Sequence, residues 1–146
     1  MRLAALSSLA LAGALALDLG GCQPPSDIPS DGECEADEDC GSRQVCARDN
    51  LCWSASDVRS VRTTWTLRGQ PPDTTTCARS PDLYIQFRGP GVENLGFSPV
   101  PCINGQFFVD KLPREFTRVE VGTDDNSVWD NTAISSAGSA AIDLAF

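Results

Sequence analysis

Four cysteines recur at every sixth position of one short acidic segment, and they constrain its fold more than any other feature. They are Cys34, Cys40, Cys46 and Cys52. A segment of this length buries too little apolar surface to fold without cross-links. A zinc ribbon uses cysteine pairs two residues apart, whereas five residues fill each gap here, so we expect disulfides and no metal. Three pairings of four cysteines are possible, and the spacing selects none of them.

The first 22 residues have the pattern of an export signal. Arg2 precedes an apolar stretch over residues 3–17, which is shorter than the roughly 20 apolar residues that a membrane-spanning helix needs. The sequence that follows, Leu19-Gly20-Gly21-Cys22, resembles the lipobox of bacterial lipoproteins, in which the cysteine receives a lipid and the chain is cleaved before it. The resemblance implies a signal peptide over residues 1–21 and acyl chains on Cys22 that anchor the protein in a lipid bilayer.

The same resemblance carries an expectation about location. In enterobacterial lipoproteins an aspartate after the lipidated cysteine favours the inner membrane, and this chain has Gln23 there. The resemblance therefore implies an exported protein anchored in the outer membrane, on the cell surface or on the periplasmic face. Residues 22–32 are rich in Pro, Ser and Asp without an apolar period, which predicts an extended tether. A plain secretory signal cut nearby and an uncleaved anchor remain alternatives.

Charge and composition exclude several classes of function. The chain has a net charge of −9, which argues against nucleic acid as a partner because that partner requires a basic surface. The chain contains no histidine, so it cannot by itself form a Ser-His or Cys-His catalytic pair, a histidine-ligated zinc site or a histidine-held haem. We expect no cofactor and no bound metal.

Only carboxylate pairs could then act as general acid and base. The candidate pairs are Asp110 with Glu120 and Asp124 with Asp130. All four residues fall in expected turns or at outward-facing strand positions, and no nucleophile elbow, phosphate-binding loop or metal motif flanks them. We therefore expect that the protein is not an enzyme.

The cysteine-rich segment, residues 33–53, has the pattern C-x-x-D-x-D-C-x(5)-C-x(5)-C. It resembles small cysteine-rich repeats of myxobacterial surface lipoproteins and, less closely, the Dickkopf N-terminal cysteine-rich module. Five acidic residues over 33–39 raise the hypothesis of calcium binding, but the order lacks the glycine and final glutamate of an EF-hand loop. A solvated acidic face is the favoured interpretation. We expect Trp53 to pack this module onto the following domain.

Residues 58–146 alternate apolar and polar residues in short runs separated by Gly, Pro, Asn and Asp. This pattern is typical of an all-β sandwich, here of six or seven strands. The residues expected to face the core are Val61, Thr63, Trp65, Leu67, Leu83, Ile85, Phe87, Thr117, Val119, Val121, Ala140, Ile142, Leu144 and Phe146.

Two local features predict how this domain is held together. Cys77 and Cys102 form an even pair in an exported chain, so we expect a disulfide between them. Closing that loop is worth about 3.5 kcal/mol in the chain-entropy model. Asn104-Gly105 lies between the apolar runs 100–103 and 106–109, and Asn-Gly favours a type I′ turn, so the sequence predicts a two-residue hairpin there.

Part of the same domain resembles a known family of sandwiches. Cys102–Phe107 followed by Asp110–Val121 is similar to the "G-x-F-x-x-x-x-L-P-x-G-x-Y-x-V-x-V" core of carboxypeptidase-regulatory-like, transthyretin-like domains. The glycine that follows Leu-Pro in that family is replaced here by Arg114-Glu115. The resemblance implies a transthyretin-like β-sandwich that is non-catalytic and serves folding support, adhesion or carbohydrate contact.

Four aromatic residues fall outside the alternation that is assigned to the core. They are Tyr84, Phe108, Phe116 and Trp129, and exposed aromatic side chains on a sheet are typical of binding surfaces. Tyr84 and Trp129 are the candidate ligand contacts. The sequence therefore favours a structural or adhesive role at the cell envelope, and a module that binds carbohydrate or protein is the alternative. The expected partner is an envelope protein or a glycan.

Overall fold

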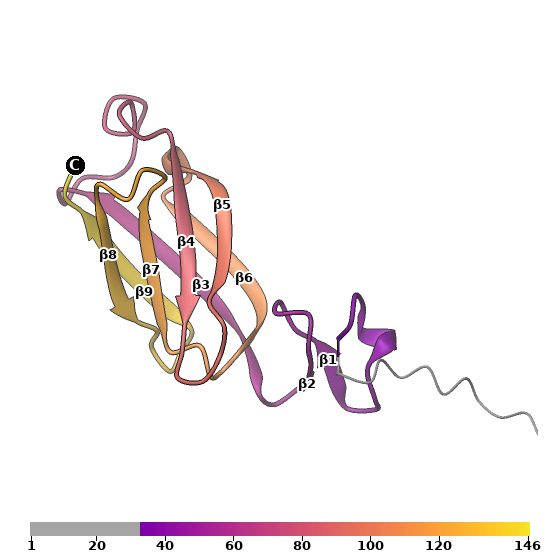
Figure 1. The fold of residues 1–146 in the computed structure, drawn as a ribbon. Coiled ribbons are helices and arrows are strands. Elements are labelled where there is room, and N and C mark those ends of the chain that lie inside the picture. Colours follow the sequence, from indigo (N-terminus) through magenta and orange to yellow (C-terminus); the bar gives the residue numbers. More distant parts are fainter. Residues whose placement is uncertain (1–32) are drawn as a thin grey trace, which may run out of the picture.

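The computed structural model describes residues 33–146, and this part of the chain is all-β as the sequence predicts. Figure 1 shows a small N-terminal module followed by a larger β-sandwich. The expected signal peptide over 1–21, the lipid anchor at Cys22 and the tether over 22–32 lie outside the described residues. Between residues 33 and 146, no helix has the length and apolar character needed to cross a bilayer.

The N-terminal module consists of a short 3-10 helix and a two-stranded hairpin. Helix η1 (Asp37–Asp39) precedes the antiparallel strands β1 (Gln44–Cys46) and β2 (Cys52–Ser54). The disulfides are Cys34–Cys46 and Cys40–Cys52, so the first cysteine pairs with the third and the second with the fourth. This confirms the disulfide-rich module and selects one of the three pairings that the sequence left open. Each bond joins a cysteine that precedes the hairpin to one of the two strands, and together they hold a segment in which few residues are buried.

The sandwich contains seven strands in two sheets. The strands are β3 (Val58–Leu67), β4 (Asp82–Arg88), β5 (Leu95–Pro101), β6 (Gln106–Pro113), β7 (Arg118–Thr123), β8 (Trp129–Ala133) and β9 (Ser139–Leu144). One sheet has the order β6-β3-β9 and the other has the order β5-β4-β7-β8. Strands β3 and β9 pair in parallel, and every other pair of strands is antiparallel.

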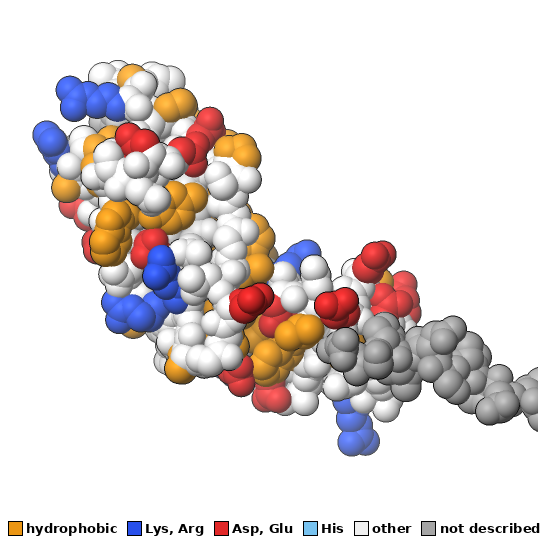
Figure 2. Space-filling model, in the orientation of Figure 1, with side chains coloured by type: hydrophobic (Ala, Val, Ile, Leu, Met, Phe, Trp, Pro, Cys, Tyr) orange, Lys and Arg blue, Asp and Glu red, His pale blue; other side chains and the backbone are white. Residues whose placement is uncertain are grey.

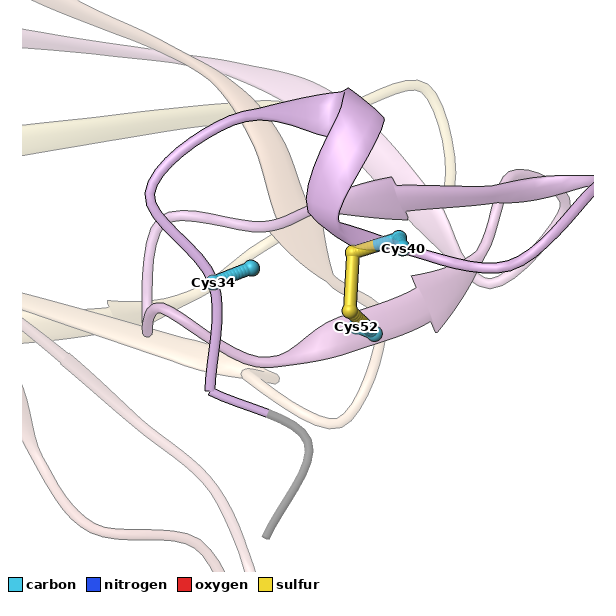
Figure 3. A group of neighbouring side chains, drawn as sticks. All are labelled: Cys34, Cys40 and Cys52. Atoms are coloured by element: carbon cyan, nitrogen blue, oxygen red, sulfur yellow. A yellow bond between two sulfur atoms is a disulfide. The ribbon is translucent and has the colours of Figure 1, made fainter. Parts of the chain in front are cut away.

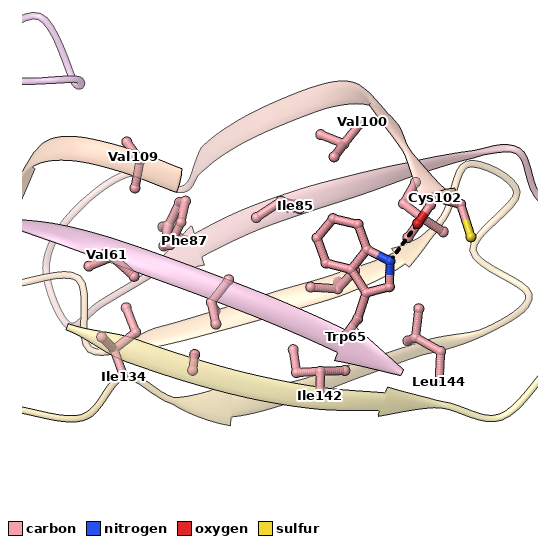
Figure 4. Close-up of a cluster of buried hydrophobic side chains, with 14 of the residues drawn as sticks. Val61, Trp65, Ile85, Phe87, Val100, Cys102, Val109, Ile134, Ile142 and Leu144 are labelled. Carbon is pink, nitrogen blue, oxygen red and sulfur yellow. Dashed lines mark hydrogen bonds between the residues drawn. The ribbon is translucent and has the colours of Figure 1, made fainter. Parts of the chain in front are cut away.

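The core lies between the sheets and is filled by every second residue of the strands (Figure 4). The inward faces expected for β3, β4 and β9 are confirmed, because every residue of these three strands that was predicted to face the core is buried. Trp65 reaches across the core, and its indole Nε1 donates a hydrogen bond of 2.8 Å to the carbonyl oxygen of Cys102. That carbonyl belongs to the connection between β5 and β6, so the bond ties the two sheets together at one end.

Two expectations near β7 are wrong. Thr117 is exposed, and Phe116, which the sequence assigned outside the core, is fully buried. The reason is a turn before β7, in which the amide of Phe116 donates to the carbonyl of Pro113. The chain enters β7 only at Arg118, so the alternation begins after Thr117 rather than at it.

The predicted hairpin at Asn104-Gly105 is also wrong. Strand β5 pairs with β4 and strand β6 pairs with β3, so this turn carries the chain from one sheet to the other. Helix η2 (Cys102–Asn104) makes the turn, and Gly105 ends it with a left-handed backbone, φ 64°. The sequence thus correctly indicates a turn that requires glycine at position 105, but packing of the core decides which strands pair. The disulfide between Cys77 and Cys102, the pair expected from the sequence, closes this end of the sandwich.

A β-bulge in β6 joins the module to the sandwich. Between Val109 and Leu112 the register with β3 shifts, so Asp110 and Lys111 occupy the bulge. Lys111 has a positive φ of 48°, and both side chains meet the module. Arg48 Nε lies 2.8 Å from Asp110 Oδ1, and Lys111 Nζ lies 2.6 Å from Oδ1 of Asp37 in helix η1. The bulge redirects two neighbouring charges toward one partner, as bulges commonly do.

The core contains one buried hydroxyl group, on Thr63, without a hydrogen-bond partner among the described residues. Because an unpartnered buried hydroxyl is costly, we predict that Thr63→Val raises the free energy of unfolding by about 1 to 2 kcal/mol. Denaturant unfolding measures it. Thr64→Val is the control, since the Thr64 hydroxyl donates to the carbonyl of Ala140 at 3.3 Å and its loss should not stabilise. Equal or lower stability of Thr63→Val would contradict the prediction.

Candidate functional site

The two aromatic residues singled out from the sequence lie in one row of the four-stranded sheet. Tyr84 of β4 pairs with Gly122 of β7, and Gly122 pairs in turn with Trp129 of β8. Directly paired residues of antiparallel strands point to the same face. Since the neighbours Ile85 and Val121 are buried in the core, Tyr84 and Trp129 belong to the outer face. We call this set of three, Tyr84, Gly122 and Trp129, the aromatic row.

Gly122 is the member of the row that sequence analysis missed. A Cβ atom at this position would lie 2.7 Å from the ring and hydroxyl atoms of Tyr84, which is closer than real contacts. The Tyr84 ring therefore lies against the backbone of Gly122, and any larger residue would displace it. Trp129 on the other side of the glycine is 54% exposed. The row thus presents two aromatic rings on either side of a glycine: the ring of Tyr84, which packs against the glycine backbone, and the ring of Trp129, which is mostly exposed.

A polar row follows one step along the strands. Glu120 pairs with Gln86 on one side and with Asn131 on the other, and Glu120 is only 8% exposed. One carboxylate oxygen of Glu120 accepts hydrogen bonds from the Tyr84 hydroxyl at 2.9 Å and from Arg88 Nη2 at 3.0 Å. Arg88 Nη2 also donates to Gln86 Oε1 at 2.6 Å. These bonds fix the polar groups beside the aromatic row before any ligand arrives.

A hollow of about 550 Å³ lies over this part of the sheet. Its lining takes Tyr84 from the aromatic row and Gln86, Arg88 and Glu120 from beside it, and adds Gly96 and Ser98 of the neighbouring strand β5 and Asn126. Gly122 and Trp129 lie outside this lining. The absence of a side chain at Gly96 leaves room beside Gln86, with which it pairs. The surface offers an aromatic face, fixed hydrogen-bonding groups and space, which is the combination that polar organic ligands require.

The carboxylate pairs considered for catalysis are not assembled into a site. Asp110 belongs to β6 and Glu120 to β7, which lie in different sheets. The hydrogen bond from Arg48 holds the pKa of Asp110 below its usual range, which favours the ionised form. Asp124 accepts a hydrogen bond from the Ser98 hydroxyl at 3.3 Å, whereas Asp130 accepts one from the adjacent backbone amide of Asn131. Each carboxylate has a different partner.

The cysteines of the module and two of its acidic residues, Asp37 and Asp39, are already engaged within the protein. The sulfur atoms of Cys34, Cys40 and Cys52 lie within 4.8 Å of one another. Figure 3 shows the bond between Cys40 and Cys52, and Cys34 is bonded to Cys46, so none of the three offers a thiolate to a metal. Asp37 accepts from Lys111, and Asp39 accepts from two backbone amides of the module. These hydrogen bonds lower the pKa of both carboxyl groups.

The remaining aromatic residues lie elsewhere. Phe116 is buried in the core, as described above, and Phe108 of β6 is 58% exposed. Phe108 pairs with Arg62 in the three-stranded sheet, so it is distant in the topology from the aromatic row. Trp53 is half-buried in the module, and its indole Nε1 donates to Asp49 at 3.0 Å.

No family model, curated protein or solved structure matches this chain. The fold and the site define it as an all-β protein in which a disulfide-rich module precedes a two-sheet sandwich with one aromatic and polar open face.

Tyr84 is the only tyrosine of the chain, so its ionisation can be followed directly. Burial, and then the hydrogen bond to Glu120, raise the pKa of Tyr84 from 10.0 to about 12. We predict that absorbance at the phenolate band titrates near pH 12 in the folded protein and near pH 10 after denaturation. A pKa raised by folding stabilises the protein fully below pH 10, and that contribution is lost as the pH rises through about 12.

A variant separates the two causes of this shift. Glu120→Gln removes the negative charge beside the phenol but leaves it buried, so the Tyr84 pKa should fall part of the way back toward 10.0. Titration of the folded wild type near pH 10 would show that the Tyr84–Glu120 contact is not formed.

Proposed function

We propose that the protein is a lipid-anchored bacterial envelope protein that makes non-catalytic, adhesive contacts through the outer face of its four-stranded sheet. The observation that carries the proposal is the aromatic row, Tyr84 and Trp129 on either side of Gly122, next to the fixed carboxylate of Glu120. Partly exposed aromatic rings with a polar handle are enriched where proteins meet their partners.

The N-terminal sequence supports display of this face away from a membrane. The lipobox ends at Cys22, and the following Pro-rich residues through Gly32 could span roughly 30 Å at about 3.1 Å per residue. The net charge of −9 disfavours close approach to anionic headgroups. A tethered and acidic domain is thus suited to contact a partner beyond the lipid surface.

A binding module for carbohydrate or protein is the second candidate function. The polar row favours it, because Glu120, Gln86 and Arg88 are positioned by one another and would need little rearrangement to meet a hydroxylated or amide-bearing ligand. The two candidates differ in their partner: adhesion requires a large envelope surface, whereas the second function requires retention of a defined soluble ligand.

Replacement of Trp129 tests the proposed face. We predict that Trp129→Ala lowers binding of the lipidated protein, carried on liposomes, to envelope fragments of the producing strain by about tenfold or more, in the range of buried aromatic contacts. Co-sedimentation measures it. The melting temperature should stay within a few degrees of wild type, because Trp129 is mostly exposed.

Phe108→Ala is the matched control, since Phe108 is similarly exposed but belongs to the other sheet. It should leave envelope binding unchanged. Equal loss of binding in the two variants, or no loss in either, would refute the assignment of the site to the aromatic row. Retention of soluble envelope polysaccharide by the wild type, lost in Trp129→Ala, would favour the second candidate function.

A further inference from the structure

The geometry points to a second binding site, a cleft between the module and the sandwich that takes an extended basic peptide segment of a partner protein. The cleft has a volume of about 960 Å³, and its walls come from both bodies. It is separate from the aromatic row, since the two share no lining residue. The lining residues are Glu33, Cys34, Glu35, Asp39, Asp49, Asn50, Leu51, Trp53, Gly91, Val92, Glu93, Glu115 and Phe116.

The charge of this cleft has one sign. Six of its lining residues are Asp or Glu, and none is Lys or Arg. Among the described residues, no hydrogen-bond or ion-pair partner is found for the carboxylates of Glu33 and Glu35 on the module or of Glu93 and Glu115 on the sandwich. Like charges on the two walls of one cleft repel each other. A cationic ligand between the walls would relieve that repulsion.

The lining of the cleft also includes apolar side chains. Leu51 is 38% exposed, and Val92 and the half-buried Trp53 lie beside it in the lining. The bond from Trp53 Nε1 to Asp49 fixes the orientation of the indole. Figure 2 shows a hydrophobic patch between acidic side chains where the module meets the sandwich. An arginine side chain suits such a surface, because its guanidinium can pair with carboxylates and stack on an indole.

The spread of the carboxylates favours a peptide over a metal ion. A calcium site needs several oxygen ligands within about 2.6 Å of one point. Among residues 33–146, the group of potential ligands whose atoms converge within 4.8 Å consists of disulfide cysteines and includes none of these acids. Charges that are distributed over the two walls of the cleft instead match a chain that carries basic side chains at intervals.

The protein's own preceding segment does not complement the cleft. Residues 22–32 contain Asp27 and Asp31 and no lysine or arginine. The tether therefore does not supply the basic segment, and we assign that segment to a partner protein.

Fluorescence anisotropy with a synthetic peptide tests this site. The full lipidated protein in neutral phosphatidylcholine nanodiscs is titrated against labelled acetyl-Arg-Leu-Arg-Leu-Arg-amide, and the same peptide with Gln in place of Arg is the comparison. We expect the Arg peptide to bind about tenfold or more tightly than the Gln peptide, and its binding to weaken as salt rises from about 0.05 to about 0.5 M.

Two double variants locate the site. Glu35→Gln with Glu93→Gln removes one charge from each wall and should weaken the Arg peptide about fivefold. Glu38→Gln with Asp82→Asn removes the same number of negative charges, but at positions outside the cleft, and should leave the affinity for the Arg peptide near that of the wild type. Trp129→Ala should have no effect, so failure here is distinguishable from failure of the sheet-face proposal.

Three outcomes would overturn the inference. Equal loss in both double variants would mean that net charge alone attracts the peptide. Equal affinity for the Arg and Gln peptides would mean that the carboxylates play no part. Stabilisation by calcium alone that is lost in the Glu35→Gln and Glu93→Gln variant, without preference for the Arg peptide, would mean that the cleft is a cation site.

Discussion

The alternation of side chains along each strand decides both the core and the candidate site. Successive residues of a strand point to opposite faces, so burial of Ile85 and Val121 between the sheets places their neighbours Tyr84 and Gly122 outside. A shift of one residue would exchange the two sets. The position of the aromatic row is therefore a consequence of the same packing that forms the core, and the rigid sheet behind it holds Tyr84 in place.

The N-terminal module depends on covalent bonds instead of a core. Its two crossed disulfides fix a segment that buries few apolar residues, and it meets the sandwich through two ion pairs at the bulge of β6. Exposed ion pairs contribute little individually. The adjacent backbone bond from Arg48 to Lys111, at 3.3 Å, adds a third contact at the same place. Together they set the cleft between the two bodies.

The sequence predicts the structure correctly where a local rule decides it. The inward residues of β3 were evident, because its period of two continues over many residues. Prediction from the sequence is wrong where distant contacts decide the structure. Asn104-Gly105 has the local chemistry of a hairpin, yet core packing sends the chain to the other sheet. The row formed by Tyr84 and Trp129 required Gly122, and only the pairing of three strands reveals that relation. The spacing of the four cysteines likewise could not select the disulfide pairing in the module.

The intact mass of the protein from its native membrane, before and after reduction with alkylation, tests the central claim of a lipid-anchored, disulfide-linked interaction protein most directly. The account predicts the mass of residues 22–146 plus three acyl chains, with six cysteines that become alkylatable only after reduction. A mass without lipid, together with cysteines that react before reduction, would contradict it.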